Sequence, residues 1–211
     1  MTETVSNRWA RWAPDVAMFL AGLILAFIVM LAVRDQVSFG PSVYKQQRTR
    51  VMVNGHALPV EFLEQVDGEA SLTQDQFALR VGERLAQHAI ETKTESCASI
   101  CRAENGAWGA APLTVGGHVI CPVTPHCPTG MTATQVSIHS HPLEKGDHFV
   151  VNEADAALGE RKGRLMKAGD PEEFSREDIQ GIGYVVTFRG TLLFQEGRGR
   201  IRRIGAVSVG Q

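Results

Sequence analysis

Two histidines, His139 and His141, stand two residues apart in a stretch with the pattern of a β-strand. Val136 and Ile138 alternate with polar residues there, and successive side chains of a strand point to opposite faces of a sheet. The two imidazoles therefore share one face and can bind a single metal ion. Pro142 follows directly and ends the strand pairing, which leaves the histidines at a strand end that a ligand can reach.

A carboxylate further along the chain is the candidate third ligand. The sequence predicts that Ser175 caps a helix and that Asp178 is its third residue, with Phe174 and Ile179 forming a hydrophobic staple around the cap. This arrangement would hold the Asp178 carboxylate on a rigid first turn. Taken alone, Ser-x-x-Asp is an ordinary capping box, and a lone His-x-His pair is more often a surface or core feature than a metal site.

The combination of the two patterns is more specific than either part. His-Ser-His-Pro at 139–142, followed by Ser-x-x-Asp at 175–178, resembles the motif of the JAB/MPN-type (JAMM) zinc peptidases, which also has a Glu upstream. The resemblance implies that His139, His141 and Asp178 hold zinc and that Ser175 steadies the oxyanion. The stretch between His141 and Ser175 is far longer than in typical members, which favours the divergent JAB-like domains of bacterial secreted and toxin-type proteins.

The upstream Glu, which in this family handles the proton of the attacking water, has two candidates. The resemblance places it on a strand before His-x-His, and this makes Glu95 the first choice, at the start of an expected strand over 95–102. Glu104 is the second choice, because it lies nearer the tip of a predicted turn. The alternative is that both are solvated surface carboxylates.

Four cysteines form an even set within one region. Two disulfides in an oxidising compartment are the favoured interpretation, and four cysteines allow three pairings. A structural zinc site is the alternative, although its Cys-x5-Cys half is looser than the usual spacing and is crowded by prolines. The residues concerned are Cys97, Cys101, Cys121 and Cys127.

The N-terminal region contains a long apolar run. Residues 16–33 carry no charge and no proline, and at about 1.5 Å per helical residue the run just spans a hydrocarbon core of about 30 Å. It exceeds the roughly 7–15 apolar residues of a signal peptide, and no Ala-x-Ala site follows it. We therefore expect an uncleaved transmembrane helix over 16–34. Together with the disulfides it predicts a single-pass protein of the bacterial inner membrane, with its C-terminal domain in the periplasm.

Composition and periodicity define the rest of the chain. With 211 residues, 44% of them hydrophobic, and a formal net charge of −2, the protein fits one globular domain with an appendage and lacks the basic character of a nucleic-acid-binding protein. The best soluble helix is expected over 71–91, where apolar residues recur at helical spacing. The expected segments are a tail (1–15), the membrane helix (16–34), a linker (35–50), a hairpin plus scaffold helix (51–93) and a JAB-like catalytic domain (94–211).

The expected fold class is α+β, a JAB/MPN-like (cytidine-deaminase-like) mixed β-sheet flanked by helices, with the transmembrane helix in front. An insertion at about 143–173 interrupts the catalytic domain, either as a tolerated excursion or as a lid over the site. Basic residues near the C-terminus, at 198–203, are expected to form a solvated sheet edge, and an anionic partner is the alternative.

Two main functions follow from the resemblance. The first is a membrane-anchored, zinc-dependent peptidase, isopeptidase or amidase, acting outside the cytoplasm on an envelope protein, a peptidoglycan cross-link or a partner's cleavage site. The alternative is a JAB-like fold kept as a non-catalytic binding module of a bacterial envelope or secretion assembly. A third interpretation is a structural membrane protein in which the histidine pair is incidental.

Overall fold

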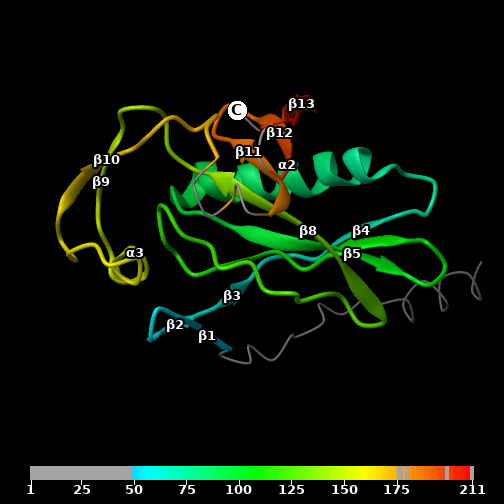
Figure 1. Ribbon diagram of the computed structural model, residues 1–211, viewed down its shortest axis with the longest axis horizontal. Helices are drawn as coiled ribbons and strands as arrows, with labels where there is room; N and C mark the ends of the chain where they lie inside the picture. The colour runs from blue at the N-terminus through cyan, green and yellow to red at the C-terminus, as the bar shows by residue number, and fades with distance from the viewer. Residues whose placement is uncertain (1–48, 175–177, 179–180, 198–199, 210–211) are drawn as a thin grey trace, which may run out of the picture. The chain divides into compact units, whose positions relative to one another are not determined.

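The computed structural model describes residues 49–174, 178, 181–197 and 200–209. They belong to one compact unit, Arg48–Gln211, built on a nine-stranded mixed sheet in which the strand order is β13-β12-β11-β8-β5-β6-β4, while β7 pairs with β5 and β3 (Figure 1). The pairing of β8 with β11 is parallel and the other pairs of the sheet are antiparallel. The strands are β3 (Glu61–Phe62), β4 (Val66–Gly68), β5 (Cys97–Ala103), β6 (Trp108–Ala110), β7 (Leu113–Thr114), β8 (Met131–His141), β11 (Ile182–Thr187), β12 (Thr191–Glu196) and β13 (Ile201–Ala206).

One face of this sheet packs against the helix α2 (Gln74–Thr92), as Figure 1 shows. Thr73 caps the helix: its side chain accepts a hydrogen bond from the Gln76 backbone, and the Gln76 side chain accepts one from the Thr73 backbone. The helix ends at Lys93, which adopts the left-handed conformation. Its apolar stripe joins residues of β8 and β11 in the main core, as the sequence predicted. Core members from these elements are Phe77, Val81, Leu85, Ile138, Tyr184 and Val186.

Two disulfides cover the opposite face of the sheet. They join Cys97 to Cys121 and Cys101 to Cys127, so both bridges tie β5 to the irregular segment that precedes β8. The prediction of two disulfides is confirmed, and of the three pairings the structure selects this one. Because the four sulfurs are bonded in two pairs, these cysteines do not form a structural zinc site.

The insertion at 143–173 is a folded part of the unit. It consists of β9 (His148–Val150), the short helix α3 (Glu153–Ala156) and β10 (Leu165–Lys167), with β9 and β10 paired antiparallel. Ala154 and Ala157 pack with residues beyond the insertion in a second buried cluster, next to the hairpin of β1 (Arg50–Val53) and β2 (His56–Pro59). The other buried members of this cluster are Leu58, Val115 and Ile120.

The predicted transmembrane helix needs correction. Residues 16–34 lie outside the described residues, and no helix in the described part of the chain is long and apolar enough to cross a membrane. The longest helix there, α2, is apolar on one side only, because charged residues interrupt it. The structure thus supports a mixed α+β fold dominated by a β-sheet, and it does not support a single-pass inner-membrane protein with a periplasmic domain. The charged residues of α2 are Asp75, Arg80, Glu83, Arg84 and Glu91.

Removing the second disulfide should lower stability without unfolding the sheet. Cys101 and Cys127 are separated by 26 residues, and closing a loop of that length in the unfolded chain is worth roughly 3–4 kcal/mol. We expect the Cys101→Ala/Cys127→Ala double variant to lose that much free energy of unfolding in urea titrations. A loss below about 1 kcal/mol would show that packing, without this disulfide, holds the irregular segment that precedes β8.

Candidate metal centre

The end of β8 presents both histidines on the sheet face opposite α2. Val136 and Ile138 of β8 belong to the core cluster under the helix, so the alternation of the strand turns His139 and His141 to the other side. His139 is buried and His141 is partly exposed. The predicted strand and the shared face of the two imidazoles are therefore confirmed.

A pair of buried serines sets the register between β8 and β5 at this end of the sheet. The Ser140 backbone N–H donates to the Ser96 carbonyl oxygen at 2.9 Å, and the Ser96 N–H donates to the Ser140 hydroxyl at 3.0 Å. Cys97 is thereby paired with His139. Glu95 lies two residues before Cys97, so the same register, continued past the end of the strand, predicts that Glu95 lies beside His141 on the same face of the sheet.

Three donor atoms converge at the end of the strand. The Nε2 atoms of His139 and His141 are 3.2 Å apart, and Oδ2 of Asp178 is 3.7 Å from Nε2 of His139. One ligand atom from each residue can be chosen so that all lie within 4.8 Å of one another. Two ligands on one tetrahedral zinc ion are separated by about 3.3 Å, because each lies about 2.0–2.1 Å from the metal. The separation of the two imidazole nitrogens is close to this value, and the carboxylate oxygen lies slightly farther from His139.

A hydrogen bond orients the candidate ligand His141. Its Nδ1 is 2.7 Å from the carbonyl oxygen of Pro171, and a carbonyl oxygen can only accept, so Nδ1 carries the proton. The lone pair of the neutral ring then lies on Nε2, which faces His139. Pro171 belongs to the insertion, so this segment orients one candidate ligand.

Burial keeps both imidazoles neutral at physiological pH. The pKa of His139 is lowered to about 4, chiefly by burial and also by the nearby His141, while the Asp178 carboxylate opposes the shift. The pKa of His141 is also lowered, chiefly by burial, against the opposing effects of the Pro171 hydrogen bond and Asp178. Metal ions bind the neutral form of histidine, so both residues are prepared for coordination without first losing a proton.

Asp178 is held from two sides through its backbone. The Gly181 N–H and the Gln195 side-chain amide both donate to the Asp178 carbonyl oxygen, at 2.9 and 3.3 Å. Gln195 lies on β12 and is buried. Sequence reasoning missed this residue, although a Gln within the apolar run of β12 was a usable signal. Ser175, the predicted oxyanion residue, lies outside the described residues.

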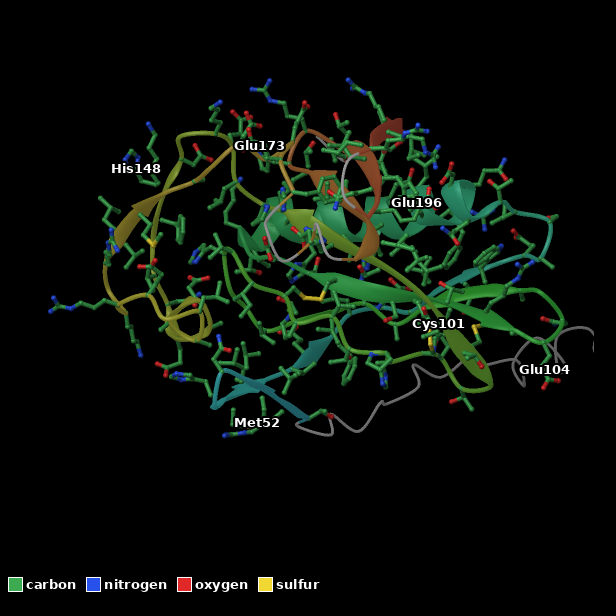
Figure 2. The ribbon with its side chains drawn as sticks, viewed as in Figure 1. Met52, Cys101, Glu104, His148, Glu173 and Glu196 are labelled. Atoms are coloured by element: carbon green, nitrogen blue, oxygen red, sulfur yellow. A yellow bond between two sulfur atoms is a disulfide. The ribbon has the colours of Figure 1, made fainter. Side chains whose placement is uncertain are left out.

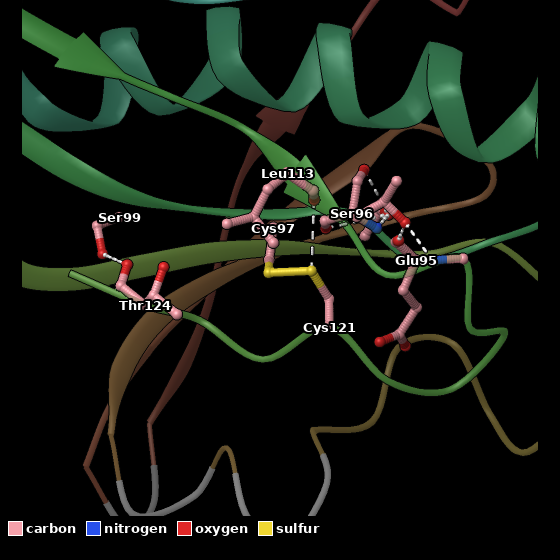
Figure 3. Close-up of a disulfide and its surroundings, with 10 residues drawn as sticks. Glu95, Ser96, Cys97, Ser99, Leu113, Cys121 and Thr124 are labelled. Carbon is pink, nitrogen blue, oxygen red and sulfur yellow. Dashed lines mark hydrogen bonds between the residues drawn. A yellow bond between two sulfur atoms is a disulfide. The ribbon is translucent and has the colours of Figure 1, made fainter. Parts of the chain in front are cut away.

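Glu95 sits immediately before β5 in a closed environment. Its backbone N–H donates to Gly117 O at 2.7 Å, and the Thr114 hydroxyl donates to Glu95 O at 2.6 Å. Figure 3 shows its side chain on the same side of β5 as the Cys97–Cys121 disulfide, away from the helix. Among the residues that the structure describes, no hydrogen bond to the Glu95 carboxyl group is found.

The environment of Glu95 disfavours its ionised form. Burial raises the pKa of the Glu95 carboxyl well above its usual range, and the negative charges of Asp178 and Asp155 add to this shift. The second candidate, Glu104, has none of these features: it is exposed on the turn beyond the far end of β5 (Figure 2). Of the two carboxylates, only Glu95 lies at the end of the sheet that carries the histidines.

A separate hollow of about 590 Å³ lies on the stapled segment that precedes β8. Residues 125–133 line it, and none of the three candidate ligands does. The candidate centre is consequently defined by its donor atoms and by Glu95, not by this hollow.

Comparison with known proteins does not assign the chain to a family. No family model matches the sequence, no curated protein matches it, and no solved structure matches the fold. The resemblance to the JAB/MPN-type peptidases thus rests on the motif residues.

The buried Glu95 should make the metal-free protein less stable as the pH rises. A carboxyl group whose folded pKa lies above its unfolded value of about 4.3 contributes stability below that value, which is lost as the pH rises through the folded pKa. We expect Glu95→Gln to raise the melting temperature at pH 7–8 in EDTA and to leave it nearly unchanged at pH 4. Thermal unfolding across this pH range measures the effect.

Glu104→Gln is the matched control, because Glu104 is exposed and its neutralisation should not alter the pH profile. His139 and His141, whose pKa values are lowered chiefly by burial, are present in both proteins. Equal melting temperatures of Glu95→Gln and the wild type at pH 8 would contradict the burial of a carboxyl group at this position.

Proposed function

We propose that this protein is a zinc-dependent hydrolase of amide bonds, acting as a peptidase, isopeptidase or amidase. The observation that carries the proposal is the convergence of His139, His141 and Asp178 at the strand end where Glu95 is also placed. The two disulfides fit a protein that works in an oxidising compartment.

The donor set supports a catalytic site better than a structural one. Structural zinc sites are usually closed by four protein ligands, whereas catalytic sites have three protein ligands and an open fourth position. The described residues supply two imidazoles and one carboxylate within ligand distance of one another. A zinc ion bound by this set supplies a nucleophile at neutral pH and a Lewis acid for the substrate carbonyl.

Glu95 is the proposed proton carrier. Burial and the neighbouring carboxylates raise the pKa of its carboxyl group. A cation at the three-ligand cluster would offset that repulsion and favour the carboxylate form that a general base requires. The Glu95 carboxylate then accepts the proton of the attacking water and delivers it to the leaving amine.

Hydrolysis is favoured over a purely binding role by this pairing of ligands with a buried acid. A non-catalytic module needs no buried carboxyl group next to its metal ligands, and burying one costs stability. The reaction class implied by the resemblance is the hydrolysis of an amide or isopeptide bond.

Zinc binding should depend on the three ligands. Loss of a partner that merely orients a ligand weakens metal affinity by about 10–100-fold, so losing a ligand itself should cost more than about 100-fold. We expect the full-length wild type to retain one zinc per chain after dialysis, and His141→Ala to retain almost none, as measured by mass spectrometry of metals. His126→Ala, which changes an exposed loop histidine, is the control and should bind zinc normally. A metal-free wild type would end the proposal.

Activity should require Glu95 while zinc binding does not. General acid–base catalysis contributes about 10²–10⁴-fold to rate. We expect Glu95→Gln to keep its zinc and to cleave at least about 100-fold more slowly, with Glu104→Gln unaffected. The assay incubates each protein with a library of linear peptides, Lys-linked isopeptides and peptidoglycan fragments and detects products by mass spectrometry. Full activity of Glu95→Gln would show that this carboxylate is not the base.

A further inference from the structure

A second buried acid, Asp155, holds a histidine next to the proposed site. Asp155 is the third residue of α3 and has no exposed surface. Its Oδ2 lies 2.7 Å from Nδ1 of His118, and its carboxylate also accepts the backbone N–H groups of His118, Val119 and Asn152. Because a carboxylate accepts hydrogen bonds, it fixes the proton of the imidazole on Nδ1 and turns Nε2 away from itself.

The His118 imidazole is not needed to anchor the insertion to the neighbouring loop. Three backbone N–H groups already bind Asp155, and the Asn152 side chain donates to Gly116 O at 2.7 Å, so the loop is held without the ring. The His118 side chain is 20% exposed, and Phe149 packs against its ring. Within the described part of the chain, no hydrogen bond engages its Nε2, which leaves this atom available to a ligand.

His118 lies on the side of Glu95 opposite His141. β5 runs between β8 and the segment 113–118, with Cys97 paired to Leu113 and the Glu95 N–H bonded to Gly117 O. Adjacent strands are about 4.8 Å apart, so this segment lies about 10 Å from β8, a distance that about three residues of extended chain cover. The negative charge of Asp155, which holds His118, also contributes to the raised pKa of Glu95, as expected if the two residues lie near each other.

We propose that His118 is a substrate-binding residue of the same site, whose Nε2 hydrogen-bonds a backbone carbonyl or amide group of a peptide substrate, and that Asp155 is its positioning residue. The inference rests on the proposed hydrolase function and deepens it. The proposed substrate is therefore a peptide and not a small isolated amide. It would extend about three residues from the scissile bond, past Glu95 to His118.

The test measures binding of hydroxamates, which attach to zinc without being cleaved, to the full-length zinc-loaded protein. Acetohydroxamate contacts the metal alone. Two tripeptide probes extend from it in the two chain directions: acetyl-Ala-Ala-Ala-hydroxamate, and a succinyl hydroxamate joined to the amino end of Ala-Ala-Ala. We expect His118→Asn to weaken one tripeptide probe by about tenfold, the size of one hydrogen bond, and to leave acetohydroxamate unchanged, as measured by calorimetry.

The variants separate contact from structure. In His118→Asn the side-chain amide can still donate to Asp155 but has no atom in place of Nε2, whereas His118→Gln offers an amide near the Nε2 position and should restore part of the affinity. His126→Asn is the matched control. It changes an exposed histidine in the irregular segment before β8 and should bind all probes as the wild type does. Should the His118 variants fail to fold, ¹⁵N spectra of the wild-type histidines give the answer: His118 should shift with one tripeptide probe and not with acetohydroxamate.

The outcomes distinguish this inference from the proposed function. A wild type that binds neither zinc nor acetohydroxamate would overturn the metal site, and the inference with it. Normal acetohydroxamate binding, with no effect of His118→Asn on either tripeptide probe or no His118 shift, would overturn the inference alone.

Discussion

The antiparallel pairing of β5 with β8 is the constraint on which the proposed site depends. Most of β5 and the end of β8 that carries the histidines are buried, and the Ser96–Ser140 hydrogen bonds set the register of the two strands at that end. A slip of one residue would turn Glu95 to the opposite face, under α2, and leave the histidines without a neighbouring acid. Fully buried hydroxyl groups are costly unless they are paired, so this register is strongly specified.

Segments with little regular structure of their own cover the sheet face that carries the histidines. Two disulfides hold the stretch before β8 against β5. The insertion contributes Ala154 and Ala157 to the second buried cluster, where they pack with Leu58, Val115 and Ile120. Through the Pro171 carbonyl and the Asp155 carboxylate, the insertion also orients His141 and His118. A segment that looked like an excursion from the motif therefore orients two side chains at this end of the sheet.

Electrostatics link the groups at this end of the sheet. Burial and the charges of two nearby carboxylates, Asp178 and Asp155, raise the pKa of Glu95, and the pKa values of His139 and His141 are lowered chiefly by burial. In the metal-free protein, burial disfavours the ionised form of Glu95 and the protonated forms of both histidines. A divalent cation would fit this arrangement, since it attracts the carboxylates and binds the neutral imidazoles.

The sequence by itself determined the local features: the helix under the sheet, the strand with both imidazoles on one face and the two disulfides, because periodicity, capping and cysteine parity are read from neighbouring residues. It did not determine the disulfide pairing, the role of Pro171 and Gln195, or the His118–Asp155 contact, which join segments distant along the chain. The expected membrane helix over 16–34 gained no support, because these residues lie outside the described ones and no helix of the described part is long and apolar enough to cross a membrane. The approach of Asp178 to the histidines was decided by the tertiary structure, because strand pairing and the hydrogen bonds to the Asp178 backbone join segments that are distant along the chain.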